Sequence, residues 1–145
     1  MNMATSVALL KIGRRVRLGL IGGGGNGLIC PVHRVAAQFD GHIELVAGVL
    51  SSYPEQLLAA ANELRLPRGY LTVADMSAGE ASRSDAVDAV AIATPNDSHV
   101  EFAELALRAG LDVICDKPIT NDRVSARRIA SLVAETAGWV DCETT

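Results

Sequence analysis

The sequence predicts a single α/β domain built on a parallel, doubly wound β-sheet. Short apolar runs alternate along the chain with longer segments of helical periodicity. The apolar runs lack the period-two alternation of a strand with one face in water, which favours strands covered on both faces. With 145 residues, 49% of them apolar and 21% charged, the chain has the size of one domain and enough apolar material for a core.

The apolar runs predict the strands of this sheet. In chain order they are residues 16–21, 43–50, 70–73, 89–94 and 113–115. The first run ends at a row of glycines, and AVAIAT ends at a proline, which cannot donate a hydrogen bond to a neighbouring strand. A helix is predicted between consecutive strands, so the strands are expected to run parallel.

The first predicted helices are recognised by apolar spacing and by capping residues. In the helix expected at 28–39, the apolar residues at helical spacing are Leu28, Val32, Val35, Ala36 and Phe39. The next helix begins at a capping box, Ser52 to Glu55, with Pro54 near the first helical position. It is expected to end near residue 66, before a proline.

The remaining helices follow the same logic. A short helix and a loop are expected in the polar segment 74–86. A helix at 99–109 is closed by Gly110, at the position that favours a left-handed residue. Asp122 is a plausible N-cap for the last helix, which is expected to end at Gly138.

The two ends of the chain are assigned to a leader and a tail. We expect residues 1–14 to be a leader, 15–138 the domain and 139–145 a short C-terminal tail. In the leader, positive charges follow a short apolar stretch, which is the reverse of a secretory signal. No stretch approaches the roughly 20 apolar residues of a membrane span, so no membrane partner is expected.

Composition argues against several function classes. The net charge is −4, and no basic stripe suited to nucleic acid appears. The cysteines are Cys30, Cys115 and Cys142, and the histidines are His33, His42 and His99. They are scattered in the sequence without a CxxC pair, so neither a metal site nor a disulfide framework is predicted. A reducing, cytoplasmic location is the natural expectation.

The glycine-rich stretch VRLGLIGGGGNG contains a candidate phosphate-binding loop. Gly22, Gly24 and Gly27 satisfy G-x-G-x-x-G between a predicted strand and a predicted helix. In that pattern the first glycine permits a tight turn, the second a close approach of the pyrophosphate and the third a close helix–strand contact. Free N–H groups at the helix start then face the phosphates, and we include Gly25 and Asn26 in this site. The alternative is a flexible glycine turn without a ligand.

The end of the second strand bears on which dinucleotide binds. An acidic residue at this point would bind the adenosine ribose hydroxyls. The chain has Ser51 and Ser52 there, with Glu55 a turn later, and no arginine that could grip a 2′-phosphate. The choice between NAD and NADP therefore stays open, with a slight lean towards tolerance of NADP. The other interpretation of Ser52 is a helix cap.

Two further polar loops follow strands. ATPNDSH, residues 93–99, follows the fourth predicted strand, and CDKP, residues 115–118, follows the fifth. Ligands of open α/β sheets bind beyond the carboxyl ends of the strands, so both loops should border the same crevice as the glycines. Ordinary turn chemistry and a surface ion pair between Asp116 and Lys117 are the alternatives.

The set GGGGNG, TPNDSH and CDKP, in this order, resembles the Gfo/Idh/MocA family of NAD(P)-dependent oxidoreductases. The similarity runs from about residue 16 to residue 138. The resemblance implies a Rossmann-type domain that holds the dinucleotide and a second, C-terminal α/β domain with most of the substrate pocket and the oligomer interface. It also implies hydride transfer between a nicotinamide and a hydroxyl group of a sugar or cyclitol.

The resemblance assigns roles to the two loops. Thr94, Pro95 and Asn96 would pass close to the cofactor, and His99 would begin the following helix beside it. The family's tripeptide more commonly begins with Glu than with Asp.

In that tripeptide, Asp116 would bind ribose hydroxyls near the nicotinamide, and Pro118 would fix the turn through a cis bond. Lys117 is the candidate catalytic residue, because its ammonium would stabilise a developing alkoxide. Cys115 is interpreted as a packed strand residue.

The resemblance also implies what residues 1–145 lack. The family's proton-transferring Asp and His come from beyond this stretch, so we expect the cofactor-binding half of an enzyme, without the second domain. The alternatives are a stand-alone, non-catalytic dinucleotide-binding module and a Rossmann domain for another ligand, such as S-adenosylmethionine or coenzyme A. Apolar surface near Trp139 would be left exposed, which predicts self-association or a C-terminal partner.

Overall fold

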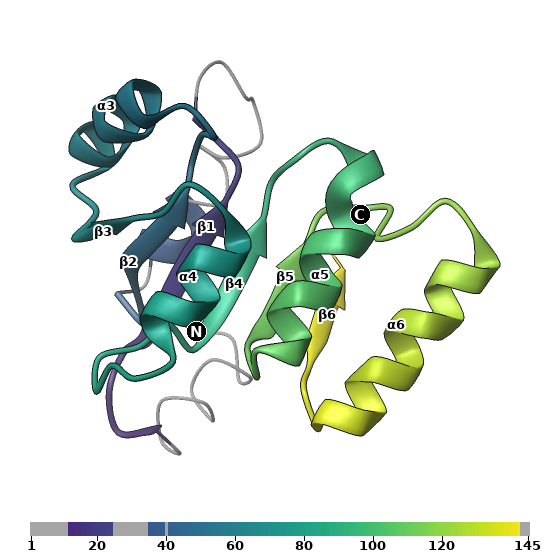
Figure 1. The fold of residues 1–145 in the computed structure, drawn as a ribbon. Helices are drawn as coiled ribbons and strands as arrows, with labels where there is room; N and C mark the ends of the chain where they lie inside the picture. Colours follow the sequence, from purple (N-terminus) through teal and green to yellow (C-terminus); the bar gives the residue numbers. More distant parts are fainter. Residues whose placement is uncertain (1–11, 25–34, 40, 143–145) are drawn as a thin grey trace.

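A computed structural model describes residues 12–24, 35–39 and 41–142 of the chain. The described strands form one 6-stranded parallel sheet in the order β3-β2-β1-β4-β5-β6 (Figure 1). The strands are β1 Val16–Ile21, β2 Ile43–Val49, β3 Arg68–Gly69, β4 Ala89–Ile92, β5 Asp112–Cys115 and β6 Val140–Cys142. The strand order reverses at β1, as in doubly wound dinucleotide-binding sheets. The predicted Rossmann-type fold is confirmed.

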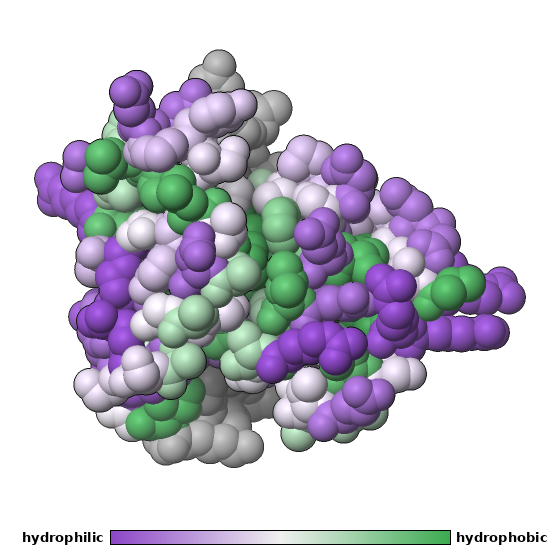
Figure 2. All heavy atoms as spheres, viewed as in Figure 1, coloured by the Kyte–Doolittle hydropathy of each residue, from purple (hydrophilic) through white to green (hydrophobic). Residues whose placement is uncertain are grey.

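Helices cover both faces of the sheet. The labelled helices are α3 Pro54–Leu64, α4 Val73–Glu80, the 3-10 helix η1 Asn96–Ser98, α5 His99–Arg108 and α6 Arg123–Thr136. Figure 1 shows α4 and α5 in front of the sheet and α6 beside α5. Figure 2 shows apolar residues on this face beside α3 and between α4 and α5, whereas hydrophilic residues cover most of α6.

Strand β4 illustrates how the core divides between the two faces. Val90 and Ile92 belong to the cluster formed with α4, α5 and α6, whereas Ala89 and Ala91 belong to the cluster on the opposite face. The second cluster includes Leu57 of α3. All four β4 residues are buried, which explains the continuous apolar run in the sequence.

Several predicted boundaries agree with the structure. Strand β1 has the predicted bounds, and α5 begins at His99. Asp122 caps α6, with its Oδ1 accepting the N–H of Ser125 at 2.8 Å. The helix ends at Thr136, and its C-cap Ala137 has a left-handed conformation, φ 52°, one residue before the predicted glycine.

The third strand was predicted two residues too late. Strand β3 is Arg68–Gly69, and of the segment predicted as strand only Val73 belongs to a regular element, as the first residue of α4. Thr72 caps this helix by accepting the Asp75 N–H on Oγ1 at 3.0 Å, and Val73 is buried as its first residue. Of the apolar side chains in this segment, that of Val73 therefore packs at the start of a helix.

The predicted capping box is also wrong. The N-cap of α3 is Tyr53, which makes no side-chain cap hydrogen bond. The Ser51 hydroxyl accepts the N–H of Tyr53 at 3.1 Å and donates to Gln56 Oε1 at 3.0 Å. Because Tyr53 occupies the N-cap position, Ser52 is not the helix cap.

The helix predicted at 28–39 lies largely outside the described residues. Within the described part, residues 35–38 are helical. Val35 and Phe39 are exposed, at 65% and 89%, whereas Ala37 is buried in the cluster of Leu18 and Leu20. The predicted apolar stripe is therefore wrong for these residues, because Ala37, and not Val35 or Phe39, packs against the sheet.

Residues 140–142, which the sequence analysis assigns to the tail, form β6 at one edge of the sheet. The strand pairs in parallel with β5. Cys115 and Cys142, distant in the sequence, are register partners on these neighbouring strands, and both are free thiols. In the described part of the chain, no helix has both the length and the apolar character to cross a membrane.

Candidate functional site

A cavity of about 570 Å³ opens beyond the carboxyl ends of β1, β2 and β4. Its volume lies within the range of small-molecule sites. The apolar part of its wall includes Val49, Leu50, Leu71, Phe102 and Leu105, and hydroxyl groups come from Ser51, Ser52, Thr72 and Thr94. An apolar wall with a few hydroxyl groups can hold a flat heteroaromatic ring attached to a sugar.

Gly22 forms the floor of this cavity, where β1 ends. It has a positive φ of 93°, and its N–H donates to the Val49 carbonyl at 2.8 Å. A Cβ at this position would lie 2.7 Å from the carbonyl oxygen of Ala93 and 2.8 Å from Cγ2 of Thr94. The position is thus restricted to glycine by both conformation and space.

Gly24 is restricted by the protein's own backbone. A Cβ there would collide with the carbonyl oxygen of Leu50 and lie 2.8 Å from its carbonyl carbon. The turn after β1 therefore passes directly against the end of β2, a contact that the sequence analysis did not foresee. Gly25, Asn26 and Gly27 lie outside the described residues, so their part in a phosphate cradle stays a prediction.

The end of β2 presents Ser51 and Ser52 to the cavity. The Ser51 hydroxyl is engaged by Tyr53 and Gln56, which leaves Ser52 as the exposed hydroxyl of the pair. Among the described lining residues, the one carboxylate is Glu101, which comes from α5. The β2 end itself carries no charge that would select between a ribose hydroxyl and a 2′-phosphate.

The loop after β4 is held in shape by a residue that the sequence analysis did not include in the site. Ser98 Oγ lies 2.7 Å from Oγ1 of Thr94 and 2.8 Å from the carbonyl oxygen of Pro95. Its hydroxyl thereby fixes Thr94 at the cavity wall, while Pro95 and Asn96 are exposed. A serine three residues after a proline, at the start of a helix, is the local signal that could have identified it.

His99 lies at the start of α5, as predicted, but its ring is fully buried. Nε2 lies 2.8 Å from the carbonyl oxygen of Thr94, and Nδ1 lies 2.9 Å from the carbonyl oxygen of Pro118. Both ring nitrogens therefore contact backbone oxygens of the protein. The imidazole joins two loops and has no exposed atom to offer a ligand.

The loop after β5 carries Asp116, Lys117 and Pro118. The Lys117–Pro118 peptide bond is cis, as predicted. Asp116 is half-buried and Lys117 is exposed. Because β4 and β5 pair in parallel, this loop and the loop after β4 lie at the same edge of the sheet.

Cys115, at the end of β5, is a packed residue, as predicted. Its side chain is buried in the core cluster that includes Val113. Burial, together with Cys142 and Asp116, raises the pKa of the Cys115 thiol to about 12. The thiol therefore stays protonated near neutral pH and is a poor nucleophile.

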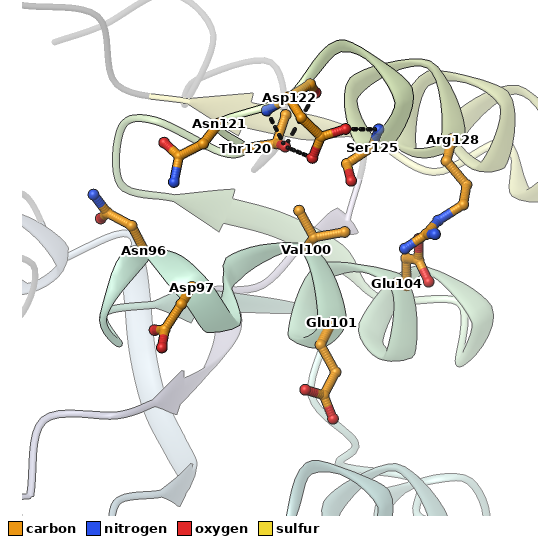
Figure 3. Close-up of a pocket in the computed structure, with 10 residues that line it drawn as sticks. All are labelled: Asn96, Asp97, Val100, Glu101, Glu104, Thr120, Asn121, Asp122, Ser125 and Arg128. Carbon is orange, nitrogen blue, oxygen red and sulfur yellow. Dashed lines mark hydrogen bonds and ion pairs between the residues drawn. The ribbon is translucent and has the colours of Figure 1, made fainter.

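A second hollow, of about 380 Å³, lies between the starts of α5 and α6. Figure 3 shows Asn96 and Asn121 at one end of it and Arg128 beside Glu104, its hydrogen-bond partner, at the other. The carboxylates lining it are Asp97, Glu101, Glu104 and Asp122, against the single guanidinium of Arg128. Such a surplus of negative charge repels phosphate groups. Of these two hollows, the cavity beside Gly22 is the better candidate for a dinucleotide.

Among residues 12–24, 35–39 and 41–142, no three His, Cys, Asp or Glu side chains are grouped so that they could hold a metal ion.

Comparison with protein families decides the affiliation of the chain. The profile of the GFO_IDH_MocA oxidoreductase family, described as an NAD-binding Rossmann fold, matches residues 16–142. The chain belongs to this family. The family named from the GGGGNG, TPNDSH and CDKP motifs is thereby confirmed, and its cofactor class is NAD.

Curated members of the GFO_IDH_MocA family resemble the chain over most of its length. An uncharacterized oxidoreductase of Bacillus subtilis is 34% identical over 132 residues, 89% of this chain and 33% of the relative. An inositol 2-dehydrogenase of Rhizobium meliloti is 36% identical over 121 residues, 83% of this chain and 33% of the relative. The chain thus spans about a third of the length of these relatives.

A solved structure of the family agrees with the fold. The inositol dehydrogenase homolog from Azotobacter vinelandii, in complex with NADH and myo-inositol, superposes with a TM-score of 0.85 and is 32% identical. The match covers 89% of this chain and 35% of that protein.

Proposed function

We propose that this chain supplies the NAD(P)-binding part of an oxidoreductase that transfers a hydride between a nicotinamide and a hydroxyl group of a sugar or cyclitol. The observation that carries the proposal is the cavity at the carboxyl ends of β1, β2 and β4, which is lined by Gly22, a position with no room for a side chain. The substrate class is supported by relatives that are named as inositol 2-dehydrogenases.

The described residues suit successive parts of a dinucleotide. The apolar wall with Ser51 and Ser52 would take the adenosine. The turn that contains Gly22 and Gly24 would take the pyrophosphate, together with residues 25–27. Thr94, Pro95 and Asn96, from the loop after β4, would border the nicotinamide half, as would Asp116, Lys117 and Pro118 from the loop after β5.

Lys117 is the proposed catalytic residue. When bound, the nicotinamide supplies the hydride chemistry. The exposed ammonium of Lys117, at the carboxyl end of β5, would stabilise negative charge on the substrate oxygen. Oxidation of an alcohol also needs a base for the hydroxyl proton. His99 cannot reach it, because its ring is fully buried and both of its ring nitrogens face backbone carbonyls. We therefore propose that the proton acceptor comes from outside the described residues.

The His99 contacts favour a second candidate function, a dinucleotide-binding module without turnover. The two functions are separated by measuring binding and turnover on the same protein. We expect NADH and NADPH to bind in calorimetric titrations, and we expect no oxidation of a panel of sugars and cyclitols by residues 1–145 alone. A longer chain that adds the family's remaining length should oxidise one of them. Binding by the longer chain without any turnover would support the module, and binding of neither dinucleotide would refute both functions.

The location of the chain is also a proposal. Cys115 and Cys142 are free thiols on paired strands, which is compatible with the reducing cytoplasm. We propose that the protein acts there.

A further inference from the structure

We infer that His99 is a positioning residue that fixes the Lys117 loop relative to the end of β4. The inference rests on the proposed function, because it holds that His99 helps to shape the part of the site that would bind the nicotinamide. The buried side chain of His99 contacts both the loop after β4 and the loop after β5.

The two contacts of His99 lie on either side of its ring. Nε2 approaches the carbonyl of Thr94, whose side chain lines the cavity. Nδ1 approaches the carbonyl of Pro118, the residue directly after Lys117. The ring thus spans from the cavity wall to the backbone beside the candidate catalytic residue.

The ring itself is held by a rigid element. His99 is the first residue of α5, and Ala103, Ala106 and Leu107 of this helix are fully buried in the core. A side chain on an anchored helix positions mobile loops more accurately than contacts between the loops themselves. The sheet core therefore determines where Lys117 stands through α5 and the imidazole.

The chemistry of the contacts requires a hydrogen-bond donor. Both partners are carbonyl oxygens, which only accept. A neutral imidazole carries one N–H and holds one loop, whereas an imidazolium holds both. A leucine of similar size would fill the space but supply no N–H to either carbonyl.

The test separates the two contacts by substitution. The amide nitrogen of asparagine can take the place of Nδ1 and keep the Pro118 contact, whereas that of glutamine can take the place of Nε2 and keep the Thr94 contact. The variants are His99→Leu, His99→Asn and His99→Gln, with His42→Gln as a matched control at a histidine outside the site. Cooperative unfolding establishes that each variant is folded.

The first measurement compares NADH with ADP-ribose, which lacks the nicotinamide. We expect His99→Leu to weaken NADH binding about tenfold, the effect of losing one or two hydrogen bonds, and to weaken ADP-ribose binding less. His99→Asn should recover more of the NADH affinity than His99→Gln. An equal loss for both ligands, or no loss for either, would overturn the inference.

The second measurement needs no ligand. Amide hydrogen exchange of residues 116, 117 and 119–122 should be faster in His99→Leu than in the wild type and slower again in His99→Asn. Unchanged exchange in His99→Leu would overturn the inference. If the wild type binds neither NADH nor ADP-ribose, the proposed function fails, and this exchange experiment still decides whether His99 holds the loop.

Discussion

The carboxylate of Glu80 receives a paired hydrogen bond from the guanidinium of Arg68, with Nε 2.7 Å from Oε1 and Nη2 3.0 Å from Oε2. The pair joins edge strand β3 to the end of α4. Oε1 also accepts the Tyr70 hydroxyl at 2.8 Å, and Oε2 accepts the Val87 N–H at 3.0 Å. The Glu80 side chain is 3% exposed, and that of Arg68 is 13% exposed.

Removing one partner of this pair should strongly destabilise the fold. We expect Arg68→Ala to lower the free energy of unfolding by about 3–5 kcal/mol, because the Glu80 charge is left buried without its partner. Urea unfolding measures the change. The matched control is Arg83→Ala, which removes an exposed ion pair with Asp85 and should cost less than about 1 kcal/mol. Equal effects of the two substitutions would contradict this account.

The same carboxylate should make stability depend on pH in the acid range. Burial alone would raise the pKa of Glu80, but the hydrogen bonds from Arg68, Tyr70 and the Val87 N–H outweigh it and hold the pKa below its ordinary value of 4.5. Since the folded pKa is the lower one, the stabilisation is fully present above pH 4.5 and is lost as the pH falls through the folded pKa.

Glu80→Gln should therefore be less stable than the wild type at pH 7. As the pH falls below 4.5, its free energy of unfolding should decrease less steeply than that of the wild type. Urea titrations at a series of pH values from neutral to acid provide the comparison. If the free energy of unfolding decreases equally steeply with falling pH in the two proteins, carboxylates other than Glu80 cause the loss of stability in acid.

The turn after β1 should tolerate no side chain at Gly22. Gly22→Ala combines a left-handed conformation with a Cβ 2.7 Å from the Ala93 carbonyl oxygen. Gly110→Ala is the matched control, because Gly110 also has a positive φ, 79°, but has no atom within 4 Å of a Cβ. We expect the control to cost about 1–2 kcal/mol and Gly22→Ala to cost more and to abolish dinucleotide binding. If Gly22→Ala and Gly110→Ala lose similar amounts of stability, the predicted clash of a Cβ at residue 22 with the Ala93 carbonyl is wrong.

The uncharged end of β2 should permit a change in cofactor preference. Ser52 is the exposed hydroxyl at the cavity, so Ser52→Asp places a carboxylate where it can bind ribose hydroxyls and repel a 2′-phosphate. We expect the ratio of NADPH to NADH affinity to fall at least about tenfold, as for a repulsion of about 1.4 kcal/mol. Ser52→Asn is the neutral control. If the ratio does not change, Ser52 does not face the adenosine ribose.

The apolar surface near the start of β6 should promote self-association. Trp139, directly before β6, is the single tryptophan of the chain and is 55% exposed. We expect light scattering to detect a mass that rises with concentration, together with a blue shift of the tryptophan emission. Trp139→Ser should weaken the association. A monomer at all concentrations would contradict it.

The order and direction of the main elements could be predicted from local sequence patterns. The run VRLGLI, the cap at Asp122 and the glycine after α5 each act within a few residues, and each prediction agrees with the structure. Predictions failed where a local pattern competed with a more distant contact. Residues 70–73 were predicted as a strand, yet Thr72 caps helix α4. Ser52 was predicted as the cap of α3, yet it is the Ser51 hydroxyl that accepts the backbone N–H of Tyr53 before this helix.

The sequence predicts which residues belong to the site but not which of them contact one another. The sequence by itself determined a parallel α/β sheet with a glycine turn at its first carboxyl end, since periodicity, caps and glycine conformation are properties of short segments. Only the tertiary structure decided that His99 joins Thr94 to Pro118, that Glu80 meets Arg68 and that residues 140–142 pair with β5. Those contacts join carbonyls, charges and strand edges brought together by the folded sheet, and no local pattern specifies which of them will meet.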